Sequence, residues 1–283
     1  MQNNFVFKNA DIHYEEFDKQ TNTLTINNIQ NEIFYLTFDH YFPQNMHINV
    51  VNSNMTIIET YLGNIANSKL IINIDENSSL KRFSLLVENE SDLTIVKDIN
   101  NYGVYHSLQI DLTNHSINST ENISLLKEEA EASVVNGIYA FAHANKKYQT
   151  NLNHSCKLTK SKAQIFAIND DFAHVQIYTD AYIKNGAIGS KTNQEGRIIN
   201  LSNTCNGIVL PNLHIDENDV EASHSCSVGS LNQEHLYYLE SRGLDTLHAR
   251  NILIKGYFNP IIENIEDEKI KATLETVITQ RIG

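Results

Sequence analysis

Short runs of β-branched and aliphatic residues recur along this chain between residues 20 and 225, and each run is bounded by Asn, Asp, Ser or Glu. Such runs are typical of β-strands, and no helical periodicity interrupts them for long. The pattern therefore predicts a mainly β fold built from many short strands. Clear examples are residues 47–51, 70–74, 83–87 and 175–178.

Many short strands at even spacing suit a sandwich, a barrel or a β-helix. The span from residue 20 to residue 225 is long for one sandwich, and the hairpin dipeptide Asn-Gly is scarce, at 136–137, 185–186 and 206–207. Asn suits the corners of a solenoid, because it tolerates left-handed backbone conformations and bonds to its own backbone in turns. These points favour a β-helix, in which each coil stacks on the one before it.

The pattern changes to a helical one near residue 230. Ser230 and Gln233 fit a capping box that begins a first helix, and Gly243 fits its left-handed C-terminal residue. Asp245 fits the N-cap of a second helix, which Asn259-Pro260 is expected to end. A third amphipathic helix is predicted from about Asp267. Its apolar stripe consists of Ile270, Leu274, Val277, Ile278 and Ile282.

Three segments follow from these patterns: an N-terminal extension over residues 1–20, a β-helix core over 21–229 and a C-terminal helical region over 230–283. Amphipathic helices need an apolar surface to cover. The helical region either caps the β body, whose open end needs closure, or docks a partner. The pattern alone leaves both readings open.

Charge and composition exclude several classes of protein. The formal net charge of -13 repels phosphate backbones, so nucleic acid is not an expected partner. No apolar run reaches the roughly 18 residues that indicate a membrane span, so no membrane partner is expected. The first residues contain neither a basic segment nor an apolar one, so we expect no signal peptide and a cytoplasmic protein.

The cysteines are few and odd in number: Cys156, Cys205 and Cys226. This count argues against a disulfide framework and leaves free thiols, either buried or available as ligands. His154-Ser155-Cys156 and His224-Ser225-Cys226 repeat the same triplet. On a strand, residues i and i+2 share a face, so each triplet is expected to place an imidazole beside a thiol. That pairing suits iron, zinc or an iron–sulfur cluster, although a short triplet can recur by chance and a free Cys is often simply buried.

Other catalytic signals are absent from the sequence. The segment 186–192 lacks the Gly that a phosphate loop needs directly before Lys191, and no nucleophile elbow or zincin motif is present. Parallel β-helices also host carbohydrate-active enzymes, which need clustered carboxylates or basic residues in a groove. No such cluster is visible in the sequence, so enzymatic activity is not expected, and a β-helix carbohydrate-active enzyme is kept as an alternative.

Four blocks resemble the SufB/SufD family, and SufD in particular. They are DVEASHSCSVGSL at 219–231, YYLESRGL at 237–244, RIINLS at 197–202 and PNLHI at 211–215. The blocks stand in the family's order and spacing, and the resemblance is good from about residue 161 to residue 254. Together they are specific, whereas each alone is weak.

This resemblance implies a right-handed parallel β-helix followed by C-terminal helices. It implies a non-catalytic scaffold subunit of a Suf-type iron–sulfur cluster assembly complex. Such a subunit associates through its β-helix with a SufB-like paralogue or a second copy, and its helices bind a SufC-like ABC-type ATPase. A transient cluster then forms at the subunit interface on Cys and His ligands. The residues expected to dock the ATPase are Leu236, Tyr237, Leu239, Arg242, Leu247, Ile252 and Tyr257.

The ligand role carried over from the family falls on His224 alone. Cys226 stands where the family has a small alanine, and we expect it to add a ligand beside His224, with Cys205 as a further metal ligand. The principal cysteine of SufB would align near Gly196, so this chain lacks that ligand. A homodimeric sole scaffold that carries the nascent cluster on its own Cys and His ligands remains the alternative.

Overall fold

The structure, a computed structural model, describes residues 17–18, 20–39, 45–262, 265 and 268–282. Residues 1–16 and 19 of the predicted N-terminal extension lie outside the described residues. The strands in chain order are β1 (Phe17–Asp18), β2 (Thr23–Asn27), β3 (Gln30–Phe38), β4 (Asn45–Val51), β5 (Asn54–Gly63), β6 (Asn67–Ile74), β7 (Ser79–Asn89), β8 (Leu93–Asn101), β9 (Val104–Asp111), β10 (Ile117–Leu125), β11 (Glu131–Ala140), β12 (Asn145–His154), β13 (Lys160–Asn169), β14 (His174–Ile183), β15 (Lys191–Asn200), β16 (Asn206–Ile215) and β17 (Glu221–Ser230).

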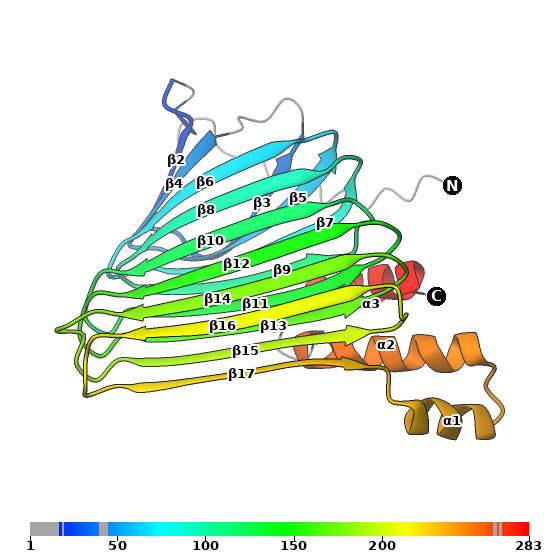
Figure 1. Cartoon of the computed structure of the whole chain (residues 1–283). Coiled ribbons are helices and arrows are strands. Elements are labelled where there is room, and N and C mark those ends of the chain that lie inside the picture. The colour runs from blue at the N-terminus through cyan, green and yellow to red at the C-terminus, as the bar shows by residue number, and fades with distance from the viewer. Residues whose placement is uncertain (1–16, 19, 40–44, 263–264, 266–267, 283) are drawn as a thin grey trace.

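These strands wind into a parallel β-helix made of two facing sheets (Figure 1). Sheet A contains β1 and the even-numbered strands in the order β1-β2-β4 through β16, and sheet B contains the other odd-numbered strands from β3 through β17. Neighbouring strands run parallel except for the β1–β2 pair. The predicted parallel β-helix is therefore confirmed. The Asn-Gly pair at 136–137 lies inside β11 and not in a hairpin.

Stacks of aliphatic side chains fill the interior between the sheets. Ile48 of β4 aligns with Ile72 of β6, which aligns with Ile99 of β8. Further along sheet A, Ala181 of β14 aligns with Leu213 of β16. The number of residues per coil therefore grows toward the C-terminus, which explains why the sequence shows no fixed period.

The interior also holds a network of charged side chains. Arg82 of β7 is fully buried, and its guanidinium donates to Glu59 of β5 at 2.7 Å and to Glu121 of β10 at 3.0 Å. Lys146 of β12 donates to both carboxylate oxygens of Asp111 in β9 at 2.8 Å. Arg82 and Lys146 thus each have a partner of opposite sign on another strand, as burial of a charge requires.

Lys97 belongs to the same interior row of polar side chains. Its ammonium donates to Gln109 Oε1 at 2.7 Å. Burial lowers the pKa of Lys97 to about 8, since water no longer stabilises the charged form. The lumen of the β-helix is therefore aliphatic along some rows and polar along others.

Three helices follow the β-helix: α1 (Gln233–Ser241), α2 (Thr246–Ile262) and α3 (Glu268–Ile282). Helices α2 and α3 cover part of the outer face of sheet B and form a second hydrophobic core with it. Gly137 of β11 permits this approach, because a Cβ there would lie 2.8 Å from Cδ1 of Ile261. The buried helix residues of this core are Ile254, Phe258, Ile261, Ile262, Leu274, Val277 and Ile278. Within the described part, α2 and α3 thus cap a face of the β body.

Two further contacts hold α2 against sheet B. Arg250 forms an ion pair with Asp170, which follows β13. The Arg197 guanidinium of β15 lies 5.5 Å from the ring centroid of Tyr257. Helix α1, by contrast, projects beyond the β-helix at the end where β17 lies (Figure 1) and buries none of its residues.

The helix boundaries correct two predictions. The N-cap of α1 is Asn232 and not Ser230, because the Asn232 side chain accepts hydrogen bonds from the backbone N–H groups of Glu234 and His235. Helix α2 continues through Pro260 to Ile262, since its last turn packs into the second core. Gly243 has a φ of +96°, as a helix-ending glycine requires.

Candidate functional site at the open end of the β-helix

The C-terminal end of the β-helix is open. Strand β17 pairs only with β15, and β16 pairs only with β14, among the described strands. One side of each strand therefore presents backbone N–H and C=O groups without a partner strand. Neither α1 nor the other described helices add a strand to this edge.

His224 and Cys226 both lie on β17, on the face that continues the interior rows of the preceding coil. His224 aligns with Gln194, and Cys226 aligns with Gly196, both buried positions of β15. Because no further coil covers them, both side chains are exposed. The structure thus brings together the two ligands expected from the sequence, as i and i+2 on one strand.

Gly196 of β15 is the residue that aligns with Cys226, and a side chain of β16 occupies the space that a side chain at Gly196 would need. A Cβ at Gly196 would collide with Cγ1 of Val209 from β16. A cysteine at this position would therefore require Val209 to move.

Cys205 lies apart from this pair. It stands in the corner that leads into β16, half-buried, and its thiol contacts the carbonyl oxygens of Asn169 at 3.2 Å and Ser202 at 3.1 Å. No three His, Cys, Asp or Glu side chains gather into a metal-binding group in the part of the chain that the structure describes. His224 and Cys226 are thus not joined by a third such side chain within the described residues.

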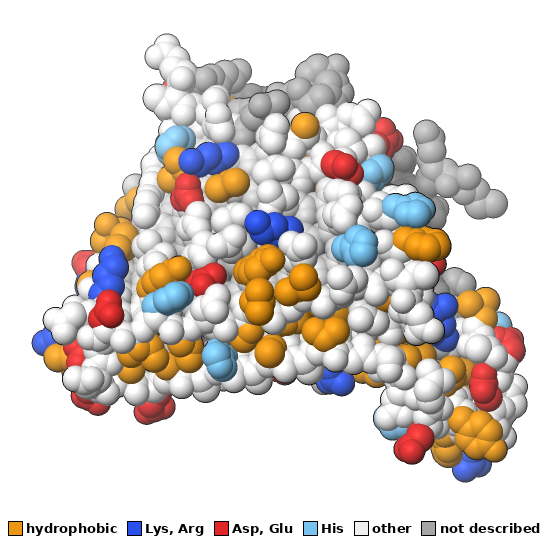
Figure 2. Space-filling view, viewed as in Figure 1, with side chains coloured by type: hydrophobic (Ala, Val, Ile, Leu, Met, Phe, Trp, Pro, Cys, Tyr) orange, Lys and Arg blue, Asp and Glu red, His pale blue; other side chains and the backbone are white. Residues whose placement is uncertain are grey.

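Apolar side chains extend from this open end over the outer face of sheet A. Figure 2 shows them gathered toward β16. Tyr182 of β14 is 38% exposed, and Ile208 and Leu210 of β16 are 37% and 49% exposed. The Tyr182 ring stacks on the His214 ring, with centroids 4.4 Å apart. Grouped apolar side chains at an unpaired edge are typical of an interaction surface.

The first His-Ser-Cys triplet does not repeat the arrangement of the second. His154 is the last residue of β12 and is fully buried, whereas Cys156 lies beyond the strand in a corner and is half-buried. The prediction that each triplet places an imidazole and a thiol on one face is wrong for residues 154–156. The strand ends between them, so the alternation of faces no longer applies.

His154 instead joins a buried chain of hydroxyl groups. Its Nδ1 lies 2.7 Å from Thr159 Oγ1, and its Nε2 lies 2.8 Å from Ser161 Oγ. Thr159 contacts Ser190 at 2.7 Å, and both hydroxyls reach the Cys156 carbonyl oxygen. If His154 Nδ1 carries the proton, it donates to Thr159 Oγ1. The hydroxyl protons of Thr159 and Ser190 then serve their mutual contact and the Cys156 carbonyl oxygen, so that each of these groups is satisfied.

The helical residues expected to dock a partner fall into two groups. Tyr237 of α1 is 73% exposed, Leu247 of α2 is 60% exposed and Ile252 is 47% exposed. Arg242 is also exposed and stacks its guanidinium 5.1 Å from the Tyr238 ring centroid. The remaining three, Leu236, Leu239 and Tyr257, are half-buried, and Tyr257 packs against sheet B.

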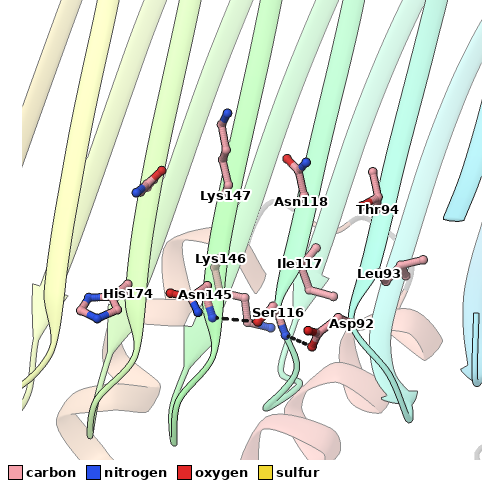
Figure 3. Close-up of a pocket in the computed structure, with 11 residues that line it drawn as sticks. Asp92, Leu93, Thr94, Ser116, Ile117, Asn118, Asn145, Lys146, Lys147 and His174 are labelled. Atoms are coloured by element: carbon pink, nitrogen blue, oxygen red, sulfur yellow. Dashed lines mark hydrogen bonds between the residues drawn. The ribbon is translucent and has the colours of Figure 1, made fainter. Parts of the chain in front are cut away.

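A shallow hollow of about 330 Å³ lies on the outer side of sheet A, where β8, β10, β12 and β14 begin. Figure 3 shows Asp92, Ser116, Asn145 and His174 along it. The Ser116 N–H donates to Asp92 at 2.8 Å, and the Asn145 N–H donates to Ser116 Oγ at 3.2 Å (Figure 3). Asp92 is the one carboxylate lining this hollow, so it offers no carboxylate pair for glycoside chemistry.

Sequence reasoning missed the interior charges around Arg82 and Lys146. Each stands at an inward position of its strand. Alternation along each strand would predict that Arg82 and Lys146 are buried only if the inward face of each strand were known. That face depends on how the coils stack, and the stacking cannot be read from the sequence because the number of residues per coil varies.

The described structure is an open-ended parallel β-helix with an exposed His and Cys on its last strand and the exposed helix α1 beside it. The SUF system FeS cluster assembly, SufBD core domain model matches residues 39–257. The chain therefore belongs to the SufBD family. No described helix is both long enough and apolar enough to cross a lipid bilayer.

Curated relatives agree with this family. The chain is 37% identical over 100 residues to the iron–sulfur cluster assembly protein SufD of Bacillus subtilis, which covers 35% of this chain and 23% of that protein. It is 24% identical over 252 residues to SufD of Plasmodium berghei, covering 87% of this chain and 18% of that protein. It is 33% identical over 72 residues to SufD of Escherichia coli, covering 25% of this chain and 17% of that protein. The chain thus spans less than a quarter of the length of each of these relatives.

Protonation of His154 is expected to destabilise the fold in acid. Burial lowers the pKa of His154 to about 4 from 6.5, so the unfolded chain binds a proton that the folded chain does not. The free energy of unfolding should fall by up to roughly 3 kcal/mol as the pH drops from 6.5 to 4. Urea unfolding across this range, with a His154→Gln variant, measures the effect.

The difference in unfolding free energy between the native chain and His154→Gln should shrink as the pH falls. His235→Gln on exposed α1 is the matched control and should show no such trend. A difference for His154→Gln that does not change between pH 7 and pH 4.5 would contradict this account.

Proposed function

We propose that this chain is a non-catalytic scaffold subunit of a Suf-type iron–sulfur cluster assembly complex. The observation that carries the proposal is the open β17 edge with His224 and Cys226 exposed on it, in a chain of the SufBD family. The curated relatives are named for iron–sulfur cluster assembly.

The partner at the open end is proposed to be a SufB-like paralogue or a second copy of this chain. A strand added to β16 or β17 would satisfy their free backbone groups, as in β-augmentation. The apolar side chains Tyr182, Ile208 and Leu210 would lie beside that junction. The mass of the isolated chain in solution distinguishes a homodimer from a subunit that awaits a paralogue.

The nascent iron–sulfur cluster is the cargo of this interface. His224 and Cys226 supply an imidazole and a thiolate, both suitable iron ligands, and the partner supplies the others. Cys205 is the weaker candidate, because its thiol is held by two carbonyl groups in its corner. The cluster is bound transiently and is passed on.

A SufC-like ATPase is proposed to dock on α1 and the first turns of α2. Tyr237, Leu247 and Ile252 give this surface its exposed apolar side chains. Helix α2 also packs on sheet B and pairs Arg250 with Asp170. Movement of the ATPase would therefore act on the β-helix through α2.

The docking surface is tested with the double variant Tyr237→Ala, Leu247→Ala. Both side chains are mostly exposed, so folding should be unchanged, whereas affinity for the ATPase should fall at least tenfold because aromatic and apolar anchors dominate interfaces. Calorimetric titration with the SufC-like ATPase measures the affinity. Tyr102→Ala, an exposed tyrosine at a corner of the β-helix, is the control, and equal affinity for both variants would defeat the assignment.

The ligand roles are tested by anaerobic reconstitution of the assembled complex with iron and sulfide. We expect His224→Ala and Cys226→Ala each to reduce bound iron and sulfide several-fold, while Cys156→Ala leaves both unchanged. Absorption spectra and iron analysis report the cluster content. Native cluster content in the Cys226→Ala complex would show that this thiol is not a ligand.

A further inference from the structure

A second hollow, of about 420 Å³, lies on the outer face of sheet B beside the C-terminal end of α2. Its floor is a row of apolar side chains on adjacent strands: Phe83 aligns with Leu108, and Leu108 aligns with Val135. Ile261 of α2 and Ile265 form its apolar wall. The hollow is thus enclosed by a sheet below and by the helical region at one side.

A row of cationic and hydroxyl side chains forms the rim of this hollow. Lys81 aligns with His106, His106 with Ser133, and Ser133 with Lys162. Neighbouring strands are about 4.8 Å apart, so this row spans roughly 14 Å from β7 to β13. The hollow therefore places two lysines, a histidine and a serine along one edge of an apolar floor.

Lys162 differs from the lysines around it. Lys160 pairs with Glu131 at 2.6 Å, and Lys191 pairs with Glu221 at 2.7 Å. Within the described residues, no carboxylate lies within ion-pair distance of Lys162, and its side chain is exposed. In a chain with a net charge of -13, this ammonium is a locally uncompensated positive charge.

The groups next to Lys162 favour an anion. On the side of the hollow, the neighbours of Lys162 are Ser133 on β11 and Gln164 two residues along β13. On its other side lies Asn193 of β15, whose amide donates to Ser223. The amide of Gln164 donates to Glu195 Oε2 at 2.9 Å. The Ser133 hydroxyl makes no hydrogen bond to another described side chain and can donate to a ligand beside Lys162.

From this arrangement we infer that the hollow binds a small organic anion with an apolar body. Its phosphate or carboxylate group lies against Lys162 and Ser133, and its apolar body lies on Phe83, Leu108 and Val135. The volume falls within the range of small-molecule pockets, and an apolar floor with few convergent polar groups is typical of them. No described residue that lines this hollow lies on β17 or α1, although Lys162 also borders a hollow that reaches Glu221 and Ser223 of β17.

The probe is 8-anilinonaphthalene-1-sulfonate, a flat amphipathic anion whose fluorescence rises in apolar surroundings. It should bind the native chain saturably with about one equivalent. Lys162→Ala should weaken binding about tenfold, because a charge-assisted hydrogen bond is lost. Lys162→Arg should restore it, and Lys160→Ala, two residues earlier on the same strand, is the matched control and should leave binding unchanged.

Competition with laurate and with adenosine monophosphate distinguishes an acyl carboxylate from an aromatic phosphate. Displacement by either one supports the inference and names the class. A second variant, Val135→Glu, places a carboxylate in the floor and should abolish binding, with circular dichroism confirming the fold. Equal affinity in Lys162→Ala and Lys160→Ala, or displacement by neither competitor, overturns the inference.

Discussion

Backbone hydrogen bonding between successive coils is the constraint on which the rest of the structure depends. Each parallel strand has its N–H and C=O groups satisfied only by the coils before and after it. The last coil, β16 and β17, has no coil after it. The same geometry that stabilises the body therefore leaves a reactive edge at its end, and the exposure of His224 and Cys226 is a direct consequence.

The interior explains how the coils are held in one arrangement up to that edge. Arg82 bridges Glu59 and Glu121 from three different strands, so a slip of one strand would leave a buried charge without its partner. Breaking such a pair is strongly destabilising, typically by about 3–5 kcal/mol. Outside the β-helix, α2 and α3 bury part of the outer face of sheet B, and α1 buries none of its residues beside the open end. The interior charges thus fix the register of the coils, and α2 and α3 cover part of sheet B outside them.

The local parts of this structure are predictable from the sequence, and the parts set by coil stacking are not. Strand runs, the Asp245 cap and the helix end at Gly243 depend on neighbouring residues, and each is found where the sequence predicts it. The pairing of His224 with Cys226 follows from alternation within β17. The burial of His154 and the hollow beside Lys162 depend on which face of each strand points inward. Only the stacking of the coils determines that face.

The most direct test is amide hydrogen exchange over residues 221–230, followed by mass spectrometry. It compares the isolated chain, at a concentration where it is monomeric, with the complex containing a SufB-like partner and a SufC-like ATPase. If β17 is an edge strand, about half of these amides have no partner strand. They should exchange quickly in the isolated chain and become protected on assembly. Unchanged exchange over this segment on assembly, or full protection in the monomer, would contradict the account.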